Sequence, residues 1–185
     1  MSKLVALSAL LIVSAAPVAA QLQDVPPPAA DVIATTGEDL LAVITQIDED
    51  AQVTGNGAQF QFNERDFILV FDENAGRMRL MTPVAPAAAL GPDLLERVLQ
   101  ANYDAVLDAR YALANDLLWS VFLHPLPSLT QRDFISGLAQ TATAAETFGT
   151  SFTSGAVVFG GGDSAELHED LLRELEDALN PKRDI

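Results

Sequence analysis

The stretch LLWSVFLHPLPSLTQRDFISGLAQTATAAETF, residues 117–148, decides the fold of this chain. Its first seven residues form two interleaved apolar sets, the pattern of a strand whose two faces both need cover. Pro125 and Pro127 then stop the strand, because neither can donate a hydrogen bond to a neighbouring strand. We therefore expect a strand over residues 117–123 and a sharp corner directly after it.

A helix is expected to begin at this corner. Thr130 and Asp133 have the spacing of a capping box, in which each side chain bonds the backbone amide of the other residue. Leu129 and Phe134 occupy the two positions of a hydrophobic staple, which fixes the angle at which the chain enters a helix. Apolar residues at helical spacing continue to Phe148, so the sequence predicts one long helix here.

The preceding residues predict the rest of an antiparallel sheet. Alternating residues indicate strands over 58–62 and 77–81, and the continuous apolar run 67–71 indicates a central strand between them. Turn-forming residues separate the three, so they are expected to form a meander. A fourth strand over 109–113 is joined to the strand over 117–123 by a two-residue turn.

Helices are expected on both sides of these strands, over residues 31–47, from Pro92 onward, and over residues 164–179. The predicted order is therefore α-β-β-β-α-β-β-α with an extra C-terminal helix. This order indicates an α+β fold, in which helices pack on a single antiparallel five-stranded sheet.

The composition divides the chain into five parts. An α+β domain is expected over residues 31–149, preceded by a proline-rich linker over residues 21–30. A glycine-rich linker over residues 150–163 leads to an acidic amphipathic C-terminal helix within residues 164–185. Residues 1–20 form the remaining part.

The first 20 residues have the pattern of a secretory signal peptide. Lys3 supplies a positive start, an apolar segment follows, and small residues lead to a cleavage position after Ala20. An uncleaved membrane anchor is the alternative, but a spanning helix needs about 20 apolar residues. We expect a periplasmic or secreted protein with no stable membrane insertion after cleavage.

The charge of the chain excludes some partners. It has 26 acidic and 10 basic residues, a net charge of −16, and no cysteine. Since the signal segment carries only the charge of Lys3, cleavage would leave −17. Such a charge repels nucleic acid, and the lack of cysteine excludes disulfides and zinc–thiolate sites.

Residues 109–134, ARYALANDLLWSVFLHPLPSLTQRDF, together with the element order, resemble the YbjN family and the wider type III secretion chaperone-like (CesT-like) fold. The resemblance implies a compact α+β domain that commonly dimerises. It also implies binding of extended client segments on apolar patches. The expected function is an exported, non-enzymatic protein-binding domain with a chaperone-like or adaptor role, whose partner is a protein client or a second copy in a homodimer.

Catalytic motifs are missing from the sequence, so no enzymatic activity, cofactor or metal site is expected. His124 stands at a strand end, and His168 has no second histidine at zinc-binding spacing. The acidic run at residues 48–50 lacks the ligand spacing of an EF-hand. The alternative function is an acidic envelope sensor that binds calcium or a small molecule.

The candidate partner-binding residues are large aromatic side chains on strands. Trp119 is the only tryptophan, and it is either a core residue or an anchor for a partner. Phe122 lies on the opposite face of the same strand, so one of the two faces must point away from the helices unless both are covered. Phe67 and Phe71 on the central strand complete the candidate set.

Overall fold

The computed structural model describes residues 35–148 and 165–179, all within one compact unit of the chain. The predicted signal peptide (1–20) and both predicted linkers (21–30 and 150–163) lie outside the described residues.

The described residues form a single antiparallel sheet of six strands and four α-helices. The prediction of an α+β fold is therefore confirmed, but the prediction of five strands is wrong. In chain order the elements are α1 (Gly37–Ile47), β1 (Gln52–Thr54), β2 (Gly57–Phe62), β3 (Arg65–Asp72), β4 (Arg77–Pro86), α2 (Pro92–Asp104), β5 (Arg110–Ala114), β6 (Leu117–Pro125), α3 (Gln131–Glu146) and α4 (Ala165–Leu179), with short 3₁₀ turns at Ala87–Ala89 and Leu126–Ser128.

The strand missed by sequence reasoning is β1, which pairs antiparallel with β2 at the edge of the sheet. Its three residues are all exposed, so they show none of the apolar alternation by which a half-buried strand is recognised. The spatial order of the strands is β1-β2-β3-β4-β6-β5, which places β6 beside β4 rather than at an edge.

β4 is longer than predicted and continues through two prolines to Pro86. Its pairing with β3 ends at Met81, and its register with β6 shifts between Pro83 and Ala85. Beyond Met81 the strand therefore pairs only with β6, and its register is irregular. A sheet tolerates proline, which has no backbone N–H, at such an edge position.

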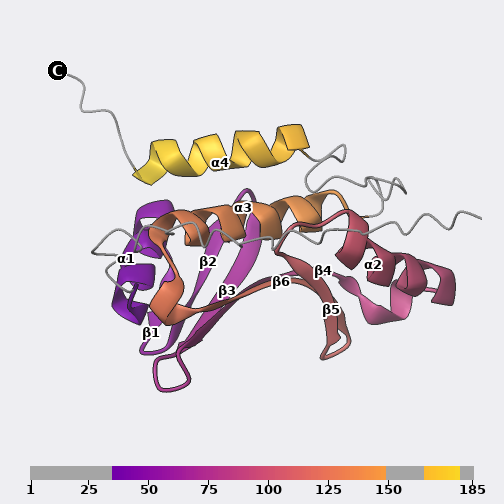
Figure 1. The fold of residues 1–185 in the computed structure, drawn as a ribbon, viewed down its shortest axis with the longest axis horizontal. Helices are drawn as coiled ribbons and strands as arrows, with labels where there is room; N and C mark the ends of the chain where they lie inside the picture. Colours follow the sequence, from indigo (N-terminus) through magenta and orange to yellow (C-terminus); the bar gives the residue numbers. More distant parts are fainter. Residues whose placement is uncertain (1–34, 149–164, 180–185) are drawn as a thin grey trace, which may run out of the picture. The chain divides into compact units, whose positions relative to one another are not determined.

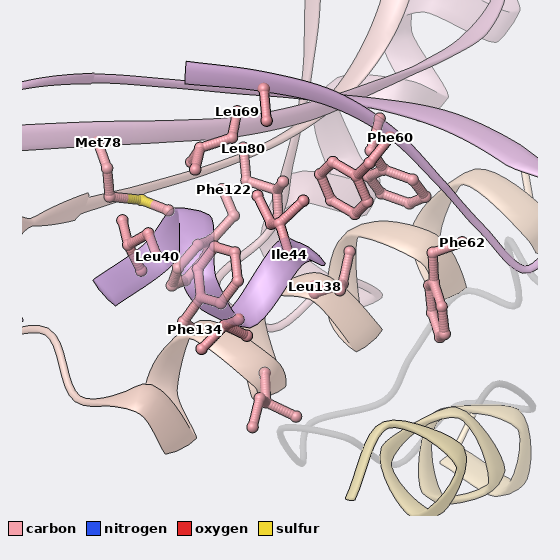
Figure 2. Close-up of a cluster of buried hydrophobic side chains, with 14 of the residues drawn as sticks. Leu40, Ile44, Phe60, Phe62, Leu69, Met78, Leu80, Phe122, Phe134 and Leu138 are labelled. Atoms are coloured by element: carbon pink, nitrogen blue, oxygen red, sulfur yellow. The ribbon is translucent and has the colours of Figure 1, made fainter. Parts of the chain in front are cut away.

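The helices α1 and α3 lie on one face of the sheet, and α4 packs against both of these helices (Figure 1). Figure 2 shows α1 side chains Leu40 and Ile44 meeting α3 side chains Phe134 and Leu138 beneath the strands. None of the helices in the described ranges is long and apolar enough to cross a membrane. The strand residues in this core are Phe60, Phe62, Phe67, Leu69, Phe71, Met78, Leu80 and Phe122, and α4 adds Leu171 and Leu175.

Two glycines allow the helices to approach the sheet closely. A Cβ atom added to Gly137 of α3 would lie 2.5 Å from the ring of Phe122 on β6. A Cβ added to Gly37 of α1 would lie 2.1 Å from the ring of Phe71 on β3. Glycine within a helix costs about 1 kcal/mol relative to alanine, so close contact with an aromatic ring is the compensating gain.

The predicted capping box at the start of α3 is confirmed. The Oγ1 atom of Thr130 accepts a hydrogen bond from the backbone N–H of Asp133, and Asp133 Oδ2 accepts one from the N–H of Thr130, both at 3.1 Å. The staple residues Leu129 and Phe134 are both fully buried. The corner between β6 and α3 is therefore specified by local chemistry and anchored in the core.

Replacing Thr130 by Ala is expected to lower the free energy of unfolding by about 1 kcal/mol at neutral pH. The hydrogen bond from the Thr130 side chain holds the pKa of Asp133 below its usual value. A lowered folded pKa means that this stabilisation is complete above the unfolded pKa and is lost as the pH falls through the folded one. Urea unfolding followed by circular dichroism should therefore show the difference shrinking below about pH 4.

The control for this measurement is Thr45→Ala, because Thr45 lies exposed within α1 and caps no helix. Its effect should be independent of pH. A Thr130→Ala deficit that stays constant down to about pH 2 would contradict the role of the charged capping box.

Candidate functional site

No helix in the described part of the chain lies over the face of the sheet opposite α1 and α3 (Figure 1). On the three central strands most side chains of this face are apolar. Side chains alternate along a strand, so residues two apart share a face and paired residues on neighbouring strands share it too. We call this surface the open face. It consists of Ile68, Val70, Met81, Pro83, Trp119, Val121 and Leu123.

Strand register arranges these residues in rows across the sheet. Ile68 on β3 pairs with Met81 on β4, which pairs with Val121 on β6. In the adjacent row Pro83 pairs with Trp119. The open face is thus apolar along these two rows, whereas its exposed members Val70 and Leu123 lie on either side of Arg79 in a third row.

Trp119 is half-buried and held in one position on the open face. Its indole N–H donates a hydrogen bond of 2.9 Å to the carbonyl of Ala114 on β5. Because the polar end of the ring is satisfied by the protein itself, the ring presents a fixed apolar surface on the open face. Pre-ordered aromatic side chains of this kind are common anchors in protein interfaces.

The other three predicted partner-binding residues lie elsewhere. Phe67 is completely buried, and Phe71 and Phe122 are 8% and 4% exposed, all under the helices. Phe122 contacts Gly137 of α3, on the face of β6 opposite to Trp119. A protein that docks on the folded domain would therefore meet Trp119 and not the three phenylalanines.

A hollow of about 670 Å³ lies at one side of the open face. Its apolar lining residues are Trp119, Ile68 and Pro83, together with Phe60 and Phe67, which are themselves buried. Its polar part comes from β1, β2, the start of β3 and the loop after α1. These polar lining residues are Asp48, Asp50, Gln52, Gln59, Gln61 and Asp66.

Sequence reasoning did not find the neighbours of Trp119 in this hollow. Ile68 and Pro83 come from segments that are far from Trp119 in the chain, and only the pairing of β3, β4 and β6 brings them together. The acidic run at residues 48–50 was noticed, but its position beside the sheet depends on β1. No local sequence signal reports a strand register.

The carboxylates of the hollow have different structural roles. Asp48 accepts two backbone hydrogen bonds, from Asp50 at 3.0 Å and from Gln61 at 2.7 Å. Asp48 thereby bonds the β2 backbone at Gln61, two residues beyond the last paired residue Gln59, where β1 no longer pairs with β2. Asp66 accepts a 3.0 Å hydrogen bond from the side chain of Gln61, and both Asp50 and Asp66 are exposed.

Metal binding finds no geometric support in residues 35–148 and 165–179. Within them, no group of three or more histidine, cysteine, aspartate or glutamate side chains is arranged to hold a metal ion. His124 stacks on Phe122 at a ring-centroid distance of 5.9 Å, away from the hollow. His168 on α4 is half-buried, and this burial lowers its pKa.

No protein-family model and no curated protein matches this chain. One chain of the HopA1–SchA chaperone–effector complex superposes with a TM-score of 0.43 and 14% identity, over 52% of this chain and 77% of its own. One chain of the ExsC–ExsE complex superposes with a TM-score of 0.47 and 16% identity, over 60% of this chain and 92% of its own. These values are too low to assign a function, and membership of the YbjN family stays a prediction.

Replacing Phe122 and Trp119 singly by Ala should separate the two faces of β6. Phe122 is 4% exposed beneath α3, so its loss is expected to cost about 3–5 kcal/mol of the free energy of unfolding. Trp119 is half-buried on the open face, so its loss should cost less than half as much. Urea unfolding followed by circular dichroism measures both variants, and equal losses would contradict the assignment of the two faces.

Proposed function

We propose that this protein is an exported, non-enzymatic protein-binding domain with a chaperone-like or adaptor role, and that it docks its partner on the open face. The observation that carries this proposal is the apolar row of Ile68, Met81 and Val121 across β3, β4 and β6, over which no described helix lies, with Trp119 held in place beside it. Contiguous apolar surface on a folded domain is characteristic of protein interfaces.

The partner is a protein client or a second copy of the chain. Although the chain is strongly acidic, three of its arginines lie on the same side of the sheet as the open face. Arg79 pairs with Val70 and Leu123, Arg110 pairs with Val121, and Arg77 pairs with Asp72. This mixed charge lowers the repulsion that would otherwise keep an acidic client, or a second copy, away from the surface.

Export is part of the proposal because residues 1–20 combine Lys3, an apolar segment and small residues before Ala20. When the complete chain is produced in a bacterium, N-terminal sequencing of the periplasmic product is expected to begin at Gln21. Ala20→Arg, which places a large charged residue at the cleavage position, should block processing. Recovery of the unprocessed chain from the cytoplasm alone would contradict export.

Docking on the open face can be tested with the mature chain, residues 21–185, and a permanently unfolded client such as reduced, carboxymethylated α-lactalbumin. Binding is measured by isothermal titration calorimetry, because the client has tryptophans of its own whose emission would overlap that of Trp119. Light scattering during size exclusion measures self-association in the same samples. Leu123→Asp is expected to weaken client binding or dimerisation about tenfold or more.

Leu99→Asp is the matched control, because Leu99 is 70% exposed on α2 whereas Leu123 is 45% exposed on the open face. The control should bind like the unmodified chain. A strict monomer that binds no unfolded client would overturn the proposed function. Loss of binding in Leu99→Asp but not in Leu123→Asp would move the docking surface to α2.

A further inference from the structure

We propose that the hollow beside Trp119 receives a basic side chain, preferably arginine, from an extended segment of the partner protein. This inference rests on the proposed function, because it specifies the chemistry of the segment that docks on the open face. The hollow combines an apolar wall with a carboxylate rim, and the two parts together match a cationic group on an apolar stem.

The charge of the hollow is one-sided. Three of its lining residues, Asp48, Asp50 and Asp66, are carboxylates, and none of the described residues that line it is basic. The other polar lining groups are the side-chain amides of glutamines on β1 and β2. A negative rim around a low-dielectric wall attracts a cation and repels an acidic segment.

The arrangement of the carboxylates favours an extended cation over a metal ion. Both oxygens of Asp48 already accept backbone hydrogen bonds, so its charge contributes to the field but its oxygens are occupied. Within the described ranges, no three acidic groups come together as metal ligands. A guanidinium or ammonium group carries several N–H donors and can bond carboxylates that are not arranged around one point.

The apolar wall explains why the cation should belong to a side chain. Trp119, Ile68 and Pro83 offer a surface for the methylene stem of arginine or lysine. The indole ring can also stack against a guanidinium group through a cation–π interaction. Arginine fits better than lysine, because its planar group stacks on aromatic rings and is less strongly hydrated.

The remaining lining groups suit an extended backbone. Gln52 and Gln59 face each other across β1 and β2, and Gln61 lies further along β2 at the same rim. Side-chain amides of this kind both donate and accept hydrogen bonds, as a peptide backbone requires. An extended segment that crosses the open face would thus place apolar residues over Met81 and Leu123 and its basic residue in the hollow.

The experiment uses the mature chain and three acetylated, amidated heptapeptides, GSVXVSG, with arginine, norleucine or glutamate at X. Binding is followed by Trp119 emission and by isothermal titration calorimetry. The arginine peptide should bind about tenfold more tightly than the norleucine peptide, and the glutamate peptide should bind most weakly. The preference for arginine should decrease as the salt concentration rises.

Charge-neutral variants locate the effect. In the double variant Asp50→Asn, Asp66→Asn the arginine and norleucine peptides should bind with equal affinity. The control Glu49→Gln, Glu96→Gln removes the same number of charges from exposed positions outside the hollow, so it should keep the tenfold preference. Equal loss of preference in both double variants would show a general charge effect and overturn the inference.

The remaining outcomes separate this inference from the proposed function. If arginine and norleucine peptides bind the unmodified chain equally, or if no peptide binds, the inference fails, while binding of the unfolded client still supports the open face. If neither peptides nor client bind and the chain is a strict monomer, both fail. If N-acetyl-arginine amide alone binds as tightly as the arginine peptide, the ligand is a small cation and the partner segment is ruled out.

Discussion

The packing of two helices on a single face of the sheet is the constraint on which the rest of the structure depends. Gly137 and Gly37 let α3 and α1 approach until the rings of Phe122 and Phe71 fill the space where their side chains would be. This contact joins segments from both ends of the domain into one core. It also determines which side of every strand is buried, since the side chains of a strand alternate between the two faces.

The open face is the direct consequence of that choice. The C-terminal helix α4 could have covered it, but α4 contributes Leu171 and Leu175 to the core on the helical side, where it packs on α3 and α1. The sheet therefore keeps an apolar surface, and the acidic chain places arginines as well as carboxylates around it. This asymmetry is the structural basis of the proposed protein-binding role, because a contiguous apolar surface on a folded domain is characteristic of protein interfaces.

Sequence reasoning succeeded where the signals are local. The capping box of Thr130 and Asp133 and the helical spacing after Phe134 act within a few residues, and the structure contains both. The strand before them ends at Pro125, two residues beyond its predicted end at residue 123. It failed at β1, which has no apolar alternation. It also ended β4 too early, because prolines usually stop a strand and this one continues to Pro86. Both misses concern backbone pairing that is held in place by a neighbouring strand and not by the residues themselves.

By itself, the sequence determined the α+β class and the corner between β6 and α3. It also determined that Trp119 and Phe122 lie on opposite faces of their strand. These features depend on periodicity and capping over short distances. The tertiary structure alone decided that Phe122 faces the helices and Trp119 the open side. It also decided that Asp50 and Asp66 lie at the same hollow as Trp119. The physical reason is strand register: residues from β1, β2, β3, β4 and β6 meet only after the strands have paired, and a shift of one residue would exchange the two faces.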